Sequence, residues 1–331
     1  MPDRRLSSRI LKGFVPLAAL LVATPAVAQR LDGLPPWEPI NPTVKGRSNL
    51  LFPGFSSHDR GVSVELALDH GSAIESQSDG RFQGSAYLLD AEVSRAAARV
   101  TVPVGHRMFV FGDVALGSGS AGFLDAAFDW WHDVFGFDMP EREERPQDSY
   151  GYFVRLPATG LVTIPEPGVY LDDTRLGAGW RAAPWLEVRA FATLPTATAE
   201  GYGRGVVSAG ATGTWRARLG GRVVHEGSAG LGVVPRHGTL AAYQRTVFAS
   251  ASAGGRVRVF GGTSLYANLF LGSPPLQGTG RAGLDGVDYS IDTGLLFATR
   301  GGWEYRVALV EDLFPRGSAI DLVVRLGVTR R

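Results

Sequence analysis

An alternation of apolar and polar side chains, repeated along most of the chain, is the feature that most constrains its fold. In the stretch 205–234, Val207 and Ala209 share one phase with other small apolar residues. Thr214 and Arg216 take the opposite phase. A period of two predicts β-strands, because successive side chains of a strand point to opposite faces. A second alternating run follows a Gly-Gly turn, so this stretch predicts a β-hairpin.

Most of the chain from 61 to 329 can be divided into copies of this hairpin. Strands that are apolar on one face and charged on the other are typical of membrane barrels, whose outside meets lipid and whose lumen is polar. The fold class predicted is all-β, an antiparallel transmembrane β-barrel of about 12 strands (range 10–14). A soluble β-sandwich is the alternative, since many short strands also fit that architecture.

The connections between the predicted strands differ in length in a regular way. Every second connection is a tight turn, as at 105–106, 182–184, 219–221, 261–262 and 301–302. Most of the others are longer, and the longest is 118–168. Short periplasmic turns alternating with long extracellular loops are expected of an outer-membrane barrel, and both chain ends then lie on the periplasmic side.

Composition excludes several other classes of protein. A mean hydropathy of +0.03 is too polar for a helical membrane protein, and 33 basic against 32 acidic residues argue against nucleic-acid binding. There are no cysteines, which excludes disulfides and thiolate metal sites. We expect no cofactor, no metal and no nucleic-acid partner.

The first 28 residues have the pattern of a signal peptide. A basic region with Arg4 and Arg5 precedes the apolar run 14–22. The predicted cleavage site consists of Ala26, Ala28 and Gln29. No later segment reaches the roughly 20 apolar residues of a transmembrane helix. An exported chain of this kind can cross a membrane only as a barrel, so we expect the outer membrane as its location and the lipid bilayer as its environment.

Two further regions follow the signal peptide. Residues 29–60 contain five prolines and are predicted to form a periplasmic arm that tucks into the barrel mouth. A disordered leader is the alternative interpretation. Residues 61–331 are predicted to form the barrel.

Charged residues recur in the phase that a barrel turns toward its lumen. The predicted lumen-lining set is Arg175, Arg181, Arg189, Arg216, Arg218, Arg222, Glu226, Asp288, Asp292 and Arg325. Such charges either pair across the lumen and plug it or line a small channel. Because unpaired charges in a confined space are costly, we expect most of them to be paired.

The stretch 122–137 breaks the period of two and has apolar residues at helical spacing. Asp125, Asp129, His132 and Asp133 lie on one narrow stripe of that helix. Three carboxylates and an imidazole could bind calcium or magnesium. The alternative is an amphipathic helix with its apolar face on the barrel or the lipid interface, and its polar stripe in water or against Arg142 and Arg145.

The same loop resembles one found in an uncharacterised family of bacterial outer-membrane barrels, known only as a domain of unknown function. The matching residues are Gly122-Phe123-Leu124-Asp125, Trp131-His132-Asp133, Phe135-Gly136 and Arg142-Glu143-Glu144-Arg145-Pro146. The resemblance implies a barrel in the outer membrane and assembly by the barrel-assembly machinery. It implies no activity, substrate or catalytic residue.

Three functions are compatible with these patterns. The first is a narrow channel or uptake barrel for a small solute, and the second is a structural or sensing barrel with a plugged lumen. The third is a lipid hydrolase that uses His70 and Ser72, which share one strand face near the outer rim. A hydrolase of this kind needs a third group to orient the histidine, and no asparagine lies on a neighbouring predicted strand.

Overall fold

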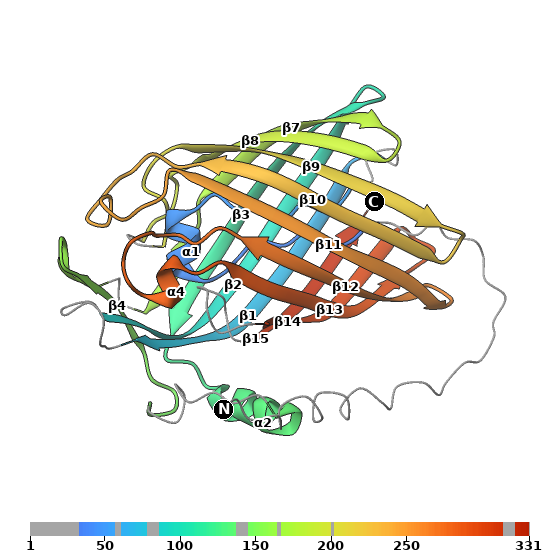
Figure 1. The fold of residues 1–331 in the computed structure, drawn as a ribbon. Coiled ribbons are helices and arrows are strands. Elements are labelled where there is room, and N and C mark those ends of the chain that lie inside the picture. The colour runs from blue at the N-terminus through green and yellow to red at the C-terminus, as the bar shows by residue number, and fades with distance from the viewer. Residues whose placement is uncertain are drawn as a thin grey trace, which may run out of the picture.

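Twelve antiparallel strands form a closed barrel in the computed structural model, which describes residues 33–56, 61–77, 86–136, 145–163, 167–199, 202–313 and 322–330 (Figure 1). The barrel strands are β1 (Ser63–Gln77), β2 (Ala86–Val104), β3 (Met108–Ser120), β7 (Thr174–Ala183), β8 (Leu186–Leu194), β9 (Ser208–Leu219), β10 (Val223–Val233), β11 (Val247–Phe260), β12 (Thr263–Gly272), β13 (Asp288–Ala298), β14 (Trp303–Asp312) and β15 (Leu322–Arg330). Each pairs with its neighbour in sequence, and β1 also pairs with β15, which closes the ring. The predicted fold is confirmed.

The described residues also form three short strands and three helices outside the barrel strands. The strands are β4 (Gly151–Leu156), β5 (Gly160–Thr163) and β6 (Gly168–Leu171), and the helices are α1 (Pro42–Arg47), α2 (Asp125–Phe135) and α4 (Ala282–Asp285). β4 extends the sheet beside β2, and β6 pairs with β3. No described helix is long and apolar enough to cross a membrane.

The two ends of the barrel differ, and we call them the turn end and the loop end. Tight turns at 105–107, 184–185, 220–222 and 261–262 lie at the turn end. Gly105, Gly220 and Gly261 have positive φ in these turns, a conformation that other residues adopt only with strain. The long connections lie at the loop end. By the usual asymmetry of outer-membrane barrels, the turn end is periplasmic and the loop end extracellular.

The two faces of the barrel wall differ as the alternation predicts. Apolar side chains on the outer face are exposed, including Leu66, Val114 and Leu231. The inner face carries buried charged residues such as Arg175 and Asp292. This is the reverse of a soluble protein, because the solvent of the outer face is lipid rather than water.

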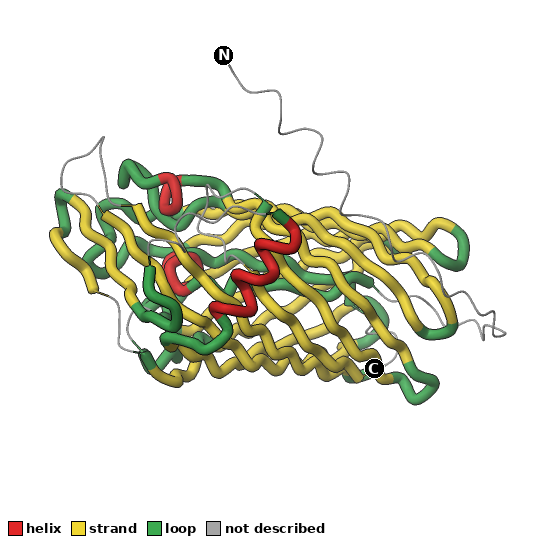
Figure 2. Tube along the Cα trace, turned by 90° about the horizontal axis from the view of Figure 1, so that it is seen from below, coloured by secondary structure: helices red, strands yellow, loops and turns green. Residues whose placement is uncertain are grey.

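Helix α2 crosses the outside of the barrel wall, as Figure 2 shows. Its Phe128 and His132 are buried, and Nε2 of His132 lies 3.6 Å from Glu311 on the outer face of β14. Trp130 and Val134 are 64% and 55% exposed, so the most apolar side of the helix points away from the barrel. Such an arrangement suits a helix at the membrane interface, with Asp125 and His132 turned inward to protein partners.

The acidic stripe of α2 does not gather into a metal site. Asp125 accepts a hydrogen bond from the backbone N–H of Asp148 at 2.7 Å, and Asp129 accepts one from Gln147 at 3.0 Å. Asp133 is exposed. No group of three or more potential metal ligands occurs among the residues that the structure describes. Asp125 and Asp129 thus contact different protein groups, and calcium binding by the stripe stays a prediction.

Several predictions fall outside the described residues. These are the signal peptide with Ala26, Ala28 and Gln29, the first part of the arm, and Arg142. Arg145, the other arginine predicted near the α2 stripe, instead donates to Asp90 of β2 at 2.8 Å.

Candidate functional site in the barrel lumen

The lumen is filled by residues 33–56, which we call the lumenal hairpin. Trp37 and Phe52 exchange two backbone hydrogen bonds, of 2.8 and 3.2 Å, and so pair the two arms of the hairpin. Almost every residue of the segment is buried. The arms run between the turn end and α1, which lies near the loop end within the ring of strands (Figure 1).

Local sequence explains why the hairpin reverses direction at α1. The Asn41 side chain accepts hydrogen bonds from the backbone N–H groups of Thr43 and Val44, which caps the helix start. Pro42 occupies the first helical position, where its missing N–H costs no hydrogen bond. The helix then buries Val44 in a cluster of apolar side chains from the surrounding strands, such as Leu89 of β2.

Glu38 of the hairpin is surrounded by three arginines. Its carboxylate accepts hydrogen bonds from Arg175 at 2.8 and 3.1 Å and from Arg95 at 2.9 Å, and Arg204 lies 3.9 Å away. Burial alone would raise the pKa of Glu38, but the three guanidinium groups outweigh it and hold that pKa well below its ordinary value. The carboxylate is therefore ionised and connects the hairpin to β2 and β7.

A second set of ionic contacts holds the loop-end part of the hairpin. Lys45 of α1 pairs with Asp172, which follows β6. Burial would raise the pKa of Asp172, yet Lys45 and Arg95 together lower it. Arg204 pairs with Asp173 at 3.2 Å and donates from Nε to the backbone oxygen of Ser48 at 2.6 Å.

At the turn end, wall carboxylates bind backbone N–H groups of the hairpin. Glu226 of β10 accepts from the backbone N–H groups of Leu34 and Phe55, and so joins both arms. Glu187 of β8 accepts from the backbone N–H and the hydroxyl of Ser56 at 2.9 and 2.6 Å. Hydrogen bonds between charged and neutral groups are stronger than those between neutral groups.

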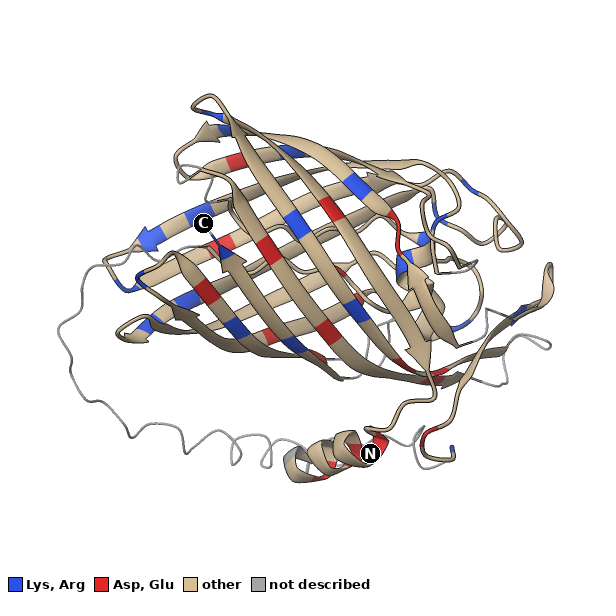
Figure 3. Cartoon of the chain, turned by 180° about the vertical axis from the view of Figure 1, so that it is seen from behind, with Lys and Arg blue, Asp and Glu red and all other residues tan. Residues whose placement is uncertain are grey.

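Arg325 of β15 links the wall to the hairpin in a third place. Its guanidinium donates to Asp69 at 2.7 Å and to Asp292 at 2.6 Å, and it also donates to the backbone oxygen of Pro36. The same group lies 4.5 Å from the centre of the Trp37 ring. Figure 3 shows how positive and negative residues alternate on neighbouring strands of the wall.

The structure locates the predicted lumen residues as follows. Six are buried on the inner face, namely Arg175, Arg189, Glu226, Asp288, Asp292 and Arg325. Arg181 and Arg216 are half-buried, and their guanidinium groups lie 5.3 and 3.8 Å from the centre of the Phe55 ring. Arg218 is exposed at the turn end of β9. Arg222 is exposed in the turn 220–222.

Sequence reasoning missed the residues that hold the hairpin. Glu38 and Lys45 were not singled out, although with Arg47 they are the three charged residues of a proline-rich segment. A charge in such a segment is the one signal that could have indicated a buried ionic partner. Their partners, such as Arg95 and Asp172, could not be inferred because they lie far away in sequence.

These features define the class of protein: a transmembrane β-barrel of the outer-membrane type, with a lumen closed by its own N-terminal segment. The protein is located in the outer membrane. No family model matches the sequence, and no curated protein matches it.

Solved structures of outer-membrane barrels resemble this chain in fold. An outer membrane channel from Pseudomonas putida F1 has a TM-score of 0.50 and 15% identity, and the match covers 82% of this chain and 95% of that one. The CymD monoaromatic hydrocarbon channel has a TM-score of 0.41 and 13% identity, covering 82% and 88%. The KdgM porin has a TM-score of 0.41 and 8% identity, covering 81% and 98%.

Proposed function

We propose that the protein is a channel for a small solute and that the lumenal hairpin is its gate. The observation that carries this proposal is the Glu38 cluster, in which a carboxylate of the hairpin neutralises arginines of the wall. Contacts of this kind are noncovalent, and breaking them requires both partners to be solvated again. The fold of the P. putida channel, with a TM-score of 0.50, is compatible with a transport role.

The path of the hairpin allows it to leave the lumen. Both of its described ends, at Gly33 and Ser56, lie near wall residues of the turn end. The segment can therefore withdraw toward the periplasm without threading a free end through the barrel. Withdrawal would leave Arg95 and Arg175 without their Glu38 partner, so an open lumen would favour anionic solutes.

A structural or sensing barrel with a permanently plugged lumen is the second candidate. The apolar cluster at the loop end favours it, because Val44, Leu50 and Phe52 of the hairpin pack there against side chains of the wall. Opening the lumen would expose these apolar groups to water, at a cost of about 25 cal/mol per Å².

Export, assembly and family membership belong to the same proposal. Residues 1–28 would be removed after Ala28, and residues 61–331 would be inserted by the barrel-assembly machinery. The remaining arm residues, 29–60, would then serve as the gate. The loop motif around Asp125 and Arg145 supports membership of the uncharacterised barrel family that the sequence resembles.

The test is single-channel conductance with and without a covalent tether on the hairpin. The chain has no cysteines, so a pair can be introduced at Asn49 and Thr193, whose side chains are 3.0 Å apart. A short bis-thiosulfonate reagent would cross-link them reversibly. We expect openings with anion preference that disappear on cross-linking and return on reduction. A folded protein that stays silent before and after reduction, and conducts only when 33–56 is deleted, would contradict the gate and support the plugged barrel.

A further inference from the structure

A serine, a histidine and a glutamate meet on the lipid-facing side of the barrel. Nδ1 of His70 lies 2.6 Å from the Ser94 hydroxyl oxygen, and its Nε2 lies 2.9 Å from a carboxylate oxygen of Glu92. We infer that Ser94, His70 and Glu92 form a catalytic triad that hydrolyses acyl esters of membrane lipids. This activity would be independent of the lumen.

Strand register brings the three residues together. His70 pairs with Ser94 across β1 and β2, and both share the outward phase of exposed residues such as Leu68. Glu92 precedes Ser94 by two residues on the same face of β2. Ser72, which the sequence suggested as the nucleophile, is 2% exposed and pairs in register with Glu92. The two ring nitrogens of His70 face Ser94 and Glu92 instead.

Glu92 is held in position to orient the histidine. Its other carboxylate oxygen accepts hydrogen bonds from the backbone N–H groups of Phe123 and Leu124, where the loop folds back over the wall. The Glu92 side chain is 1% exposed, and that of His70 is 22% exposed. An ionised carboxylate only accepts, so Nε2 of His70 carries the hydrogen and Nδ1 is free to accept the Ser94 proton.

The triad lies at the height of the outer leaflet. His70 is eight residues beyond Val62, which is exposed near the turn end. At roughly 3.3 Å per residue and a tilt near 40°, that places His70 about 20 Å above Val62, near the top of an apolar band about 25 Å tall. Ester groups of lipids lie at this boundary between acyl chains and headgroups.

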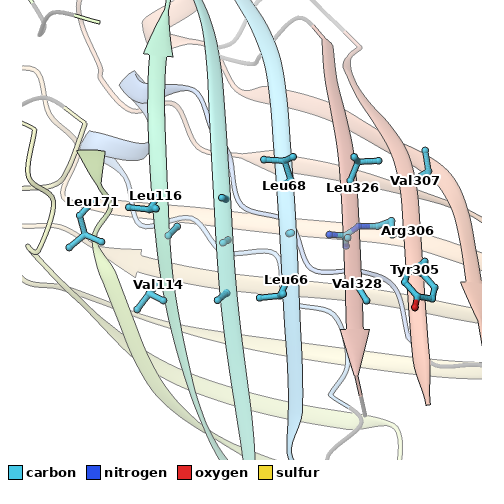
Figure 4. Close-up of a pocket in the computed structure, with 16 residues that line it drawn as sticks. Leu66, Leu68, Val114, Leu116, Leu171, Tyr305, Arg306, Val307, Leu326 and Val328 are labelled. Atoms are coloured by element: carbon cyan, nitrogen blue, oxygen red, sulfur yellow. The ribbon is translucent and has the colours of Figure 1, made fainter. Parts of the chain in front are cut away.

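A groove for an acyl chain begins directly below the triad. It has a volume of about 740 Å³, and its lining is almost entirely apolar. Ala96 and Ala98 continue the face of Ser94 down β2, and their small side chains form the floor. Larger side chains line the neighbouring strands: Figure 4 shows Leu66 and Leu68 on one and Val114 and Leu116 on another.

The chemistry requires only an ester and water. The Ser94 oxygen attacks the carbonyl carbon while its proton passes to Nδ1 of His70. The tetrahedral intermediate then collapses, the bond to the alcohol oxygen breaks, and that oxygen takes the proton from His70. Water, deprotonated by the same nitrogen, releases the fatty acid and restores Ser94. Ser118, opposite Ser94 on β3 and in the same outward phase, is placed to donate its hydroxyl to the developing oxyanion.

The first test uses the refolded full chain with two probes, dipalmitoyl phosphatidylethanolamine and lipid A, in mixed micelles. We expect release of fatty acid, and a fluorophosphonate should label Ser94. Release from one probe alone assigns the substrate to glycerophospholipid or to lipid A, and release from both assigns a general acyl-ester hydrolase. A folded protein that releases fatty acid from neither probe overturns the inference.

Variants test the roles of the residues. Ser94→Ala and His70→Asn should lower the rate by roughly 10³-fold or more, whereas the matched control Ser72→Ala should not. Glu92→Gln should lower the rate, because the imidazole loses the carboxylate that orients it, and Glu92→Asp should restore part of the rate. The heat-dependent gel shift of folded barrels checks each variant. Activity that survives Ser94→Ala, or labelling that falls on another residue, refutes the assignment.

Discussion

Replacing Glu38 by glutamine tests whether charge holds the lumenal hairpin in place. The carboxylate is 8% exposed and contacts two guanidinium groups within 2.9 Å and a third at 3.9 Å. Removing one partner of a buried ion pair costs about 3–5 kcal/mol, because the other charge stays buried without compensation. Since 1.4 kcal/mol is a factor of ten, the equilibrium between docked and withdrawn hairpin should shift by a factor between roughly 10² and 4 × 10³.

The shift can be measured as open probability in planar bilayers and as protease sensitivity of residues 33–56 in detergent. Glu65→Gln is the matched control, since Glu65 pairs with Arg306 of the wall at 3.6 Å rather than with the hairpin. We expect Glu38→Gln to increase both readouts strongly and Glu65→Gln to change them little. Equal effects of the two variants would refute the reasoning, as would a hairpin that remains protected in Glu38→Gln.

Three further predictions follow from particular contacts. The pKa of Glu38 is held well below its ordinary 4.5, so the carboxylate should stabilise the docked hairpin fully above about pH 4.5 and lose this effect as the pH falls through the lowered pKa. The difference in protease sensitivity between the parent and Glu38→Gln should therefore shrink at low pH. A constant difference down to pH 2 would contradict this. Gly179→Ala should destabilise the barrel by about 1–3 kcal/mol, because a β-carbon there would lie 2.1 Å from the Phe109 ring. Gly213→Ala, which has open space around it, should be tolerated. Urea-gradient gel-shift assays measure both. Brominated lipid quenches the fluorescence of tryptophans that contact the membrane. Trp130→Phe should reduce this quenching more than Trp131→Phe does, since Trp130 is the more exposed of the two. Equal reductions would mean that α2 does not present Trp130 to the membrane.

The channel and the lipid hydrolase use separate parts of the wall, so they can be tested separately. The hairpin contacts belong to the inner phase of β2, at Arg95, and the triad belongs to the outer phase, at Glu92 and Ser94. The two faces of one strand, β2, thus carry both the hairpin contact and two residues of the triad. Ser94→Ala should leave conductance unchanged, and Glu38→Gln should leave ester hydrolysis unchanged.

The sequence by itself determined the barrel, its strand number and its two unlike ends. These properties are local. The alternation in 205–234 predicts which side chains face lipid, and the lengths of the connections distinguish the turns from the loops. The helix over 122–137 was also predicted from its spacing. Its orientation was not, because an apolar face can pack against protein or face lipid, and only contacts such as His132 with Glu311 decide between them.

Only the tertiary structure decided what the lumen contains and which residues meet. Residues 33–56 have no periodicity, so their sequence predicts no more than an arm at the barrel mouth. The contacts of Glu38 with arginines more than 50 residues away place the segment along the lumen. The triad depends on register in the same way, since His70 meets Ser94 and Glu92 only because β1 and β2 pair without a shift. A slip of one residue would turn each of these side chains to the other face, and sequence patterns do not record the register between strands.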